Sequence, residues 1–149
     1  MPNTSPIAIV LAAGKGTRMN SDLPKVLHEA TGKTLLAWVL DALNDAGCTE
    51  RIVVVGYGGE KVRAHIGARP GVQFAVQQKQ LGTGDAVRAA VPSIESALTA
   101  GARSRPVVIV CGDSPLLRPL SIRRLLNAFQ STGAACLLGA AITEDPTGL

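Results

Sequence analysis

The sequence has few aromatic residues and few charges. Phe, Trp and Tyr make up only 3% of the 149 residues, and charged residues make up 17%. Proteins that bind single-stranded nucleic acid usually combine clustered Lys and Arg with aromatic side chains on which bases stack. The basic residues here are dispersed, so the net charge of +4 suits a small anionic ligand at least as well as a polymer. We therefore expect no nucleic-acid partner.

Cysteines are also scarce, and the three present, Cys48, Cys111 and Cys136, form no CxxC pair. This spacing favours reduced thiols over a zinc site or a disulfide framework. Cys111 lies inside an apolar run, which predicts a buried, unreactive thiol. No apolar run approaches the ~20 residues that span a bilayer, and the N-terminus lacks the basic region of a signal peptide. We therefore expect a cytoplasmic protein with no membrane partner.

Apolar residues, in contrast, make up 46% of the chain and gather in short runs that alternate with stretches of helical period. The length suits one domain. Continuous β-branched runs predict strands that are covered on both faces. Strands are expected at residues 7–11, 51–55, 72–76 and 107–111, with a fifth at 135–141. The alternation predicts a three-layer, Rossmann-like α/β fold with a mostly parallel sheet.

Four stretches between these runs carry apolar residues at helical spacing. Helices are expected at residues 35–46, 59–66, 83–98 and 121–130. Ser121 is expected to be the N-cap of the last helix, and Pro92 is expected to end or kink the third. A parallel sheet that ends at Ala141 leaves an apolar edge uncovered, which predicts either self-association, as in a homo-oligomer, or poor solubility.

The loop after the first expected strand, LAAGKGTRM at residues 11–19, combines glycines with basic residues. Ligands of open parallel sheets bind beyond the carboxyl ends of the strands. Gly14 and Gly16 permit a left-handed backbone and expose N–H groups. Lys15 and Arg18 add positive charge, which suits a triphosphate or a pyrophosphate. The loop fits neither the dinucleotide fingerprint nor the P-loop pattern, so an ordinary glycine-rich turn remains an equal alternative.

Pro24 fixes the backbone just before Lys25, which can hold the ammonium group at a defined place. The longer run LAAGKGTRMNSDLPKVLH resembles the signature of sugar-nucleotide pyrophosphorylases, in particular the N-terminal uridyltransferase domain of bacterial GlmU-type N-acetylglucosamine-1-phosphate uridyltransferases. The resemblance implies that the loop wraps the nucleotide phosphates and that Lys25 contacts them. By matching position, the implied nucleotide-binding and catalytic residues are Leu11, Ala12, Ala13, Gly14, Lys15, Gly16, Arg18 and Lys25.

Polar residues also follow the third expected strand, where Gln77 begins the run QQKQLGTG. A Gln side chain offers a carbonyl and an amide, a pair that can match the imide edge of uracil. Gly82 lets the backbone approach a flat base, and Thr83 either contributes a hydroxyl or caps the next helix. The run QLGTGDAV resembles the block that recognises uracil in the same family, which implies base contacts by Gln77, Gly82 and Thr83. Asp85 stands where many members have histidine and is assigned no role.

A carboxylate, Asp113, follows the fourth expected strand in the run CGDSPLL. Mg²⁺ favours one or two carboxylates together with phosphate oxygens and water, so Asp113 is a candidate metal ligand; a turn-capping Asp is the alternative. The run is similar to the family's GDxPLL motif, whose Asp binds Mg²⁺. In the family a second metal ligand and several sugar contacts lie further along the chain. The resemblance thus implies that residues 1–149 are the nucleotide-binding half of a nucleotidyltransferase domain, incomplete at the C-terminus.

The reaction that the resemblance implies joins UTP and N-acetylglucosamine 1-phosphate into UDP-N-acetylglucosamine, a cell-wall precursor, and releases pyrophosphate. Such a reaction requires two polyanions to be held together and their charge to be neutralised. Arg18, Lys25 and Mg²⁺ on Asp113 are the expected catalytic groups. Two alternatives stay open, namely a pyrophosphorylase for another sugar 1-phosphate and a nucleotide-binding module without catalysis.

Overall fold

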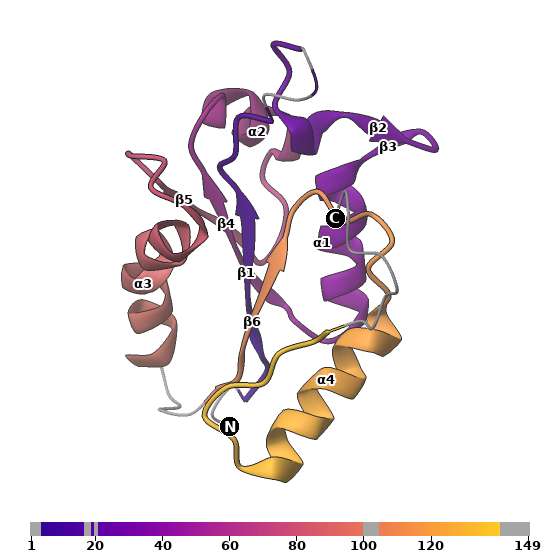
Figure 1. Ribbon diagram of the computed structural model, residues 1–149, viewed down its shortest axis with the longest axis vertical. Coiled ribbons are helices and arrows are strands. Elements are labelled where there is room, and N and C mark those ends of the chain that lie inside the picture. Colours follow the sequence, from indigo (N-terminus) through magenta and orange to yellow (C-terminus); the bar gives the residue numbers. More distant parts are fainter. Residues whose placement is uncertain (1–3, 17–18, 20, 100–104, 141–149) are drawn as a thin grey trace.

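A parallel sheet runs through the centre of the computed structural model, which describes residues 4–16, 19, 21–99 and 105–140 (Figure 1). The four strands lie in the order β5-β4-β1-β6, and all three pairings are parallel. The strands are β1 (Ile7–Ala12), β4 (Glu50–Val55), β5 (Val72–Val76) and β6 (Val107–Cys111). The first four strands predicted from the sequence are thereby confirmed to within one residue.

Helices cover both faces of the sheet, as a three-layer fold requires (Figure 1). Helix α3 (Thr83–Thr99) lies on one face, and α1 (Leu35–Asp45) and α4 (Pro119–Thr132) lie on the other. The short helix α2 (Gly59–Ile66) follows β4 at the carboxyl end of the sheet. The predicted three-layer α/β fold with a parallel sheet is confirmed.

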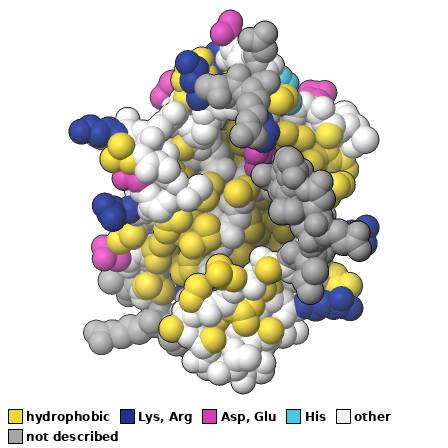
Figure 2. Space-filling view, viewed as in Figure 1, with side chains coloured by type: hydrophobic (Ala, Val, Ile, Leu, Met, Phe, Trp, Pro, Cys, Tyr) yellow, Lys and Arg dark blue, Asp and Glu magenta, His cyan; other side chains and the backbone are white. Residues whose placement is uncertain are grey.

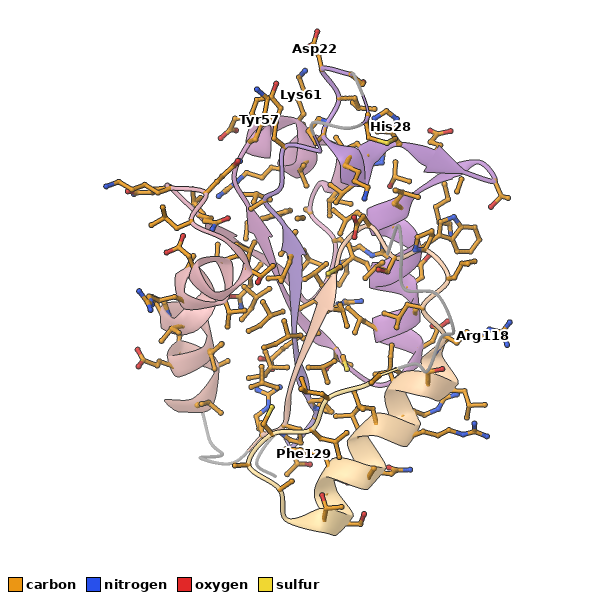
Figure 3. All side chains as sticks on the ribbon, in the orientation of Figure 1. Asp22, His28, Tyr57, Lys61, Arg118 and Phe129 are labelled. Atoms are coloured by element: carbon orange, nitrogen blue, oxygen red, sulfur yellow. The ribbon has the colours of Figure 1, made fainter. Side chains whose placement is uncertain are left out.

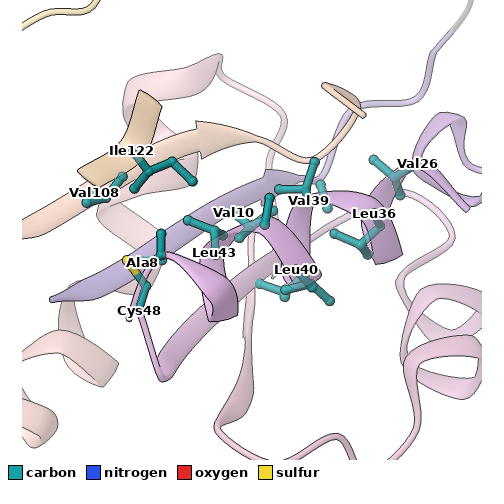
Figure 4. Packing of buried hydrophobic residues seen from close by; sticks show 14 of the residues in the cluster. Ala8, Val10, Val26, Leu36, Val39, Leu40, Leu43, Cys48, Val108 and Ile122 are labelled. Carbon is teal, nitrogen blue, oxygen red and sulfur yellow. The ribbon is translucent and has the colours of Figure 1, made fainter. Parts of the chain in front are cut away.

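The central strand β1 sends alternate side chains into two separate cores. Ile7 and Ile9 pack in the core under α3. Ala8 and Val10 pack in the core under α1 and α4, which Figure 4 shows from close by. All four residues are fully buried, and this explains why the run is continuously apolar rather than alternating.

One prediction about a helix end is wrong. Helix α4 begins at Pro119 with Arg118 as its N-cap, so Ser121 lies inside the first turn and does not cap it. The fixed φ of proline suits the first helical position, where its missing N–H costs nothing. The helix expected at residues 83–98 is confirmed to within one residue as α3, and Pro92, expected to end or kink it, lies inside it. Pro92 and Arg88 are both exposed, so water can bond the Arg88 carbonyl that Pro92 leaves without a helical donor.

The fifth predicted strand is absent from residues 135–140, and Ala141 lies outside the described residues. The segment is rich in alanine and glycine, which have low strand propensity and little side chain to pack. Strand β6 is therefore an edge strand in the described part of the chain, and Val107 and Ile109 are 41% and 51% exposed. The expectation that every strand is covered on both faces is wrong for β6. Figure 2 shows apolar side chains gathered on this side of the molecule.

A small hairpin that the sequence analysis did not predict follows the 3₁₀ turn η2 (Lys25–Leu27). It consists of β2 (Glu29–Ala30) and β3 (Lys33–Thr34), joined by Thr31 and Gly32, whose φ angles are both positive. Two residues with positive φ are typical of the turns that match strand twist in hairpins. The hairpin delivers the chain to Thr34, whose hydroxyl accepts a hydrogen bond from Ala37 N and caps α1.

One ion-pair cluster ties α1 to the hairpin and to the loop before β5. Asp41 on α1 accepts hydrogen bonds from Lys33 and Arg69. Burial acts to raise the pKa of Asp41, but the two cationic donors outweigh it and hold the pKa below its usual value. No helix in the described ranges is both long enough and apolar enough to cross a membrane.

Candidate functional site

A cavity of about 390 Å³ opens at the carboxyl ends of β1 and β6 and beside the start of α3. Polar side chains and glycines from three separate loops line it together with the strand ends. Its lining consists of Leu11, Ala12, Ala13, Gly14, Gly16, Lys25, Val26, Gln77, Gln80, Gly82, Thr83, Ala86, Cys111 and Asp113. Three loops that are distant in the sequence thus meet at the edge where parallel sheets bind ligands.

A second cavity, of about 580 Å³, lies between β6, α4 and the segment that follows α4. It is larger, but its described lining is almost entirely apolar, and Arg105 is the one charged residue among the described lining residues. Recognition of a small polar ligand requires several convergent polar groups. Size therefore favours the second cavity, whereas chemistry favours the first, and we take the first as the functional site.

One end of the first cavity, which we call the charged end, consists of Gly14, Gly16, Lys25 and Asp113. The ammonium nitrogen of Lys25 lies 2.6 Å from Oδ2 of Asp113, and the two side chains are 44% and 28% exposed. Each charge has a partner but remains open to solvent, so an incoming charged ligand can compete for either one. The charged end can therefore exchange this internal pair for contacts with a ligand.

Two glycines fix the backbone around Lys25. Gly16 has a φ of +63°, and a Cβ built on it would lie 2.8 Å from Cβ of Lys25. Gly58, just before α2, also has a φ of +63°, and a Cβ there would lie 2.6 Å from the Pro24 ring. Pro24 is buried, and its carbonyl accepts a hydrogen bond from Leu27 N. The Pro24–Lys25 segment thus packs against two positions that only glycine can occupy without rearrangement.

Asp113 owes its position to the end of β6. The N–H of Gly112 donates to Leu11 O over 2.9 Å, which ties the loop to the end of β1. A Cβ on Gly112 would lie 3.1 Å from that same oxygen, so a side chain would push the loop away. Cys111, predicted to be buried, is exposed and lines the cavity. The prediction is wrong because α3 does not cover this face of β6, a property that the strand's own sequence does not reveal.

A second part of the lining, which we call the amide end, consists of Gln77, Gln80, Gly82 and Thr83 from the loop after β5 and the start of α3. Gln77 is only 6% exposed, and its backbone N–H donates to Val55 O. Its side-chain Nε2 donates to Gly82 O over 3.0 Å and to Oδ2 of Asp85 over 2.8 Å. Gln80 reaches across to the first loop, where its Nε2 donates to Ala13 O. Hydrogen bonds therefore hold the amide end in one arrangement.

The structure brings the site residues predicted from the sequence together around this cavity, with two exceptions. Lys15 is exposed and does not line the cavity; its ammonium group lies 5.1 Å from the centroid of the Tyr57 ring. Figure 3 shows Tyr57 at the end of the molecule where α2 lies. Arg18 lies outside the described residues. Thr83 lines the cavity as the first residue of α3.

Several lining residues were not predicted from the sequence. Val26 and Ala86 contribute apolar surface from η2 and α3, and Cys111 contributes its thiol. Val26 lies within the PKVLH segment, so its neighbours in the sequence could have indicated it. Nothing local indicates Ala86, which faces the cavity only because α3 packs against the end of β1.

The site carries a single carboxylate for a metal ion. Asp113 is the one acidic residue in the lining, and the described residues hold no cluster of three or more His, Cys, Asp or Glu that could enclose a metal. Mg²⁺ is commonly held by one or two carboxylates, with substrate phosphates and water completing its shell. The donor set fits a cation that arrives with a phosphate ligand and does not fit an enclosed structural metal.

Comparisons with known proteins agree with this geometry. A sequence profile described as the MobA-like NTP transferase domain matches residues 8–145. The chain is 45% identical to the bifunctional protein GlmU of Heliobacterium modesticaldum and 48% identical to that of Gloeobacter violaceus. Each match covers 95% of this chain but only 29% of the relative. The chain thus spans less than a third of the length of these relatives.

A structural comparison extends the likeness to the fold. The crystal structure of Rv0371c from Mycobacterium tuberculosis, in complex with manganese, matches with a TM-score of 0.61 and 27% identity. The match covers 87% of this chain and 61% of the other. The likeness thus extends over most of the chain.

Proposed function

Because the chain belongs to the MobA-like NTP transferase domain family, we propose that it binds UTP and transfers its uridylyl group to N-acetylglucosamine 1-phosphate. The products are UDP-N-acetylglucosamine and pyrophosphate. The observation that carries the proposal is the meeting of a charged end and an amide end in one cavity at the carboxyl ends of the strands. The polarity of the two ends matches a triphosphate and a nucleobase.

The reaction needs no nucleophile from the protein. A phosphate oxygen of the sugar 1-phosphate attacks the α-phosphorus of UTP, a new P–O bond forms, and the bond to the β-phosphate breaks so that pyrophosphate leaves. The main barrier is the repulsion between two polyanions. Lys25 binds phosphate oxygens once a ligand displaces Asp113 from its ammonium group. The N–H groups around Gly14 and Gly16 hold the leaving phosphates, and Arg18 supplies further positive charge for the same reaction.

Asp113 is the residue that would hold Mg²⁺ in this site. When bound, the cation supplies positive charge to the phosphate oxygens. The turn at Gly112 orients the Asp113 carboxylate. This carboxylate is released from its ion pair when Lys25 binds the phosphates instead. Gln77, Gly82 and Thr83 hold the base at the other end, and Gln80 keeps the two loops at a fixed separation by its bond to Ala13.

The test is pyrophosphate release from UTP and N-acetylglucosamine 1-phosphate, measured with Mg²⁺ and then with EDTA. We expect release that depends on Mg²⁺. Calorimetric titration with UTP in parallel separates the two ways of failing. Binding without release would make this chain a nucleotide-binding part that needs further residues for catalysis. Absence of UTP binding would contradict the proposal altogether.

A further inference from the structure

The hydrogen bonds of Gln77 fix which of its two polar atoms can meet a ligand. A primary amide has two N–H donors and one carbonyl acceptor. Both donors are engaged, since Nε2 bonds to Gly82 O at 3.0 Å and to Oδ2 of Asp85 at 2.8 Å. The carbonyl oxygen Oε1 takes part in neither bond, and Gln77 lines the cavity. The amide therefore offers the cavity an acceptor and no donor.

The chemistry of the two partners determines this orientation. A backbone carbonyl and a carboxylate are both acceptors only. If the amide were rotated by half a turn, Oε1 would face two oxygens, and both Nε2 hydrogen bonds would be lost in a side chain that is 94% buried. Gly82 O is also the acceptor for Ala86 N at the start of α3, so its position is set by the helix. Asp85 is the one partner contributed by a side chain.

We propose that Asp85 is a positioning residue that locks the Gln77 amide and thereby selects a nucleobase with a ring N–H donor. This inference rests on the proposed function, because it concerns the base of the nucleotide bound in the same cavity. Uracil carries a hydrogen on N3, which can donate to Oε1. The N3 atom of cytosine is an acceptor and would meet Oε1 with its lone pair. The lock thus favours UTP over CTP by repelling the wrong base.

Asp85 also lies in the first turn of α3, where any carboxylate stabilises the helix through the dipole. A purely structural role of that kind would change stability and would leave the choice of base untouched. Glu60 provides the matched control, since it is an exposed carboxylate in the first turn of α2 and does not line the cavity that contains Gln77. The informative quantity is therefore the ratio of the affinities for UTP and CTP.

The experiment titrates the full chain and the variants Asp85→Ala, Asp85→Asn and Glu60→Ala with UTP and with CTP by calorimetry. The wild-type chain is expected to prefer UTP by about tenfold to a hundredfold, the effect of leaving one buried polar group unpaired. Asp85→Ala is expected to lower this preference by about threefold or more, with Gly82 O left as the remaining acceptor for the Gln77 amide. Asp85→Asn retains an acceptor oxygen and should keep it, and Glu60→Ala should leave it unchanged.

Three results would overturn the inference. The first is a preference for UTP that is as large in Asp85→Ala as in the wild-type chain. The second is a Gln77 side-chain amide that exchanges its hydrogens in the wild-type chain as fast as a solvated glutamine, measured by NMR and assigned with Gln77→Leu. This second measurement needs no folded Asp85 variant. If neither nucleotide binds the wild-type chain, the proposed function fails, whereas equal binding of both nucleotides contradicts only the lock.

Discussion

The charged end and the amide end of the cavity hold their polar groups in different ways. Lys25 and Asp113 are partly exposed and neutralise each other across 2.6 Å, and solvent reaches both. Gln77 is almost fully buried, and both of its side-chain donors are engaged by the protein. The amide end is thus arranged before a ligand arrives, whereas the charged end must rearrange. Affinity should therefore come mainly from the charged end and selectivity from the amide end.

Replacing Asp113 should have the largest effect on turnover. We expect Asp113→Ala to lower pyrophosphate release by about 100- to 1000-fold, the usual cost of losing one group that stabilises transition-state charge. In EDTA the same variant should bind UTP at least as tightly as the wild-type chain, because its Lys25 is no longer engaged by a carboxylate.

The control for this variant is Asp45→Ala, which removes an exposed carboxylate on α1 that does not line the cavity. Its turnover and its UTP affinity should equal those of the wild-type chain. Weaker UTP binding by Asp113→Ala in EDTA would mean that the ion pair shapes the site and does not compete with the ligand.

Replacing Lys25 should weaken phosphate binding without changing the choice of base. We expect Lys25→Gln to lower the affinity for UTP by about tenfold, since a charge-assisted hydrogen bond to phosphate is lost at a partly exposed site. The ratio of UTP to CTP affinity should stay constant. Lys61→Gln serves as the control, because Lys61 is exposed, its ammonium group donates to Asp22 O, and it does not line the cavity (Figure 3). A changed base ratio in Lys25→Gln would show that the two ends are not independent.

Adding a methyl group at Gly16 tests how firmly the backbone holds Lys25. Gly16→Ala combines a left-handed backbone with a Cβ that would lie 2.8 Å from Lys25 Cβ. Gly133→Ala, after α4, has the same φ of +63° but no atom within 4 Å of the new Cβ. We expect a loss of about 1 kcal/mol in unfolding free energy for Gly133→Ala and about 2 kcal/mol for Gly16→Ala, measured by urea denaturation. Equal losses would show that Lys25 yields to the methyl group without cost.

The smallest effect on stability is expected for Asp41, which forms the ion-pair cluster with Lys33 and Arg69 and does not line the cavity. The pKa of Asp41 is lowered in the folded chain, so its stabilising effect is complete above the unfolded pKa of about 4 and is lost as the pH falls through the folded pKa. Asp41→Asn should therefore cost about 1 kcal/mol at pH 7 and almost nothing near pH 2. Denaturation curves at both pH values check this. A loss that is independent of pH would assign the effect to packing.

The core of the fold could be predicted from the sequence because its strands are continuous β-branched runs. In β1 and β4 such a run is required by burial on both faces, and the pattern is correspondingly clear. The failures lie where tertiary context decides. Residues 135–140 are apolar enough for a strand, yet they form no ladder with β6. The two-residue strands β2 and β3 are too short to carry any periodicity.

The site was predictable to the extent that it consists of loops after strands. Lys25, Gln77 and Asp113 are polar residues in such loops, and the parallel sheet brings them to one edge. The contact between Asp85 and Gln77 was not predictable, since a carboxylate in the first turn of a helix usually serves the helix itself. The exposure of Cys111 depends on how far α3 extends over the sheet, which no local pattern encodes.

The most direct test of the account is a titration of the ¹⁵N-labelled chain with UTP, followed through its backbone amide signals. We predict that the signals of Gly14, Gly16, Gln77 and Gly82 shift together and saturate at one common UTP concentration. The signals of Val107 and Ile109, which line the aliphatic cavity, should stay in place. Saturable shifts confined to one end of the site, or centred on β6, would contradict a single nucleotide site built from both ends.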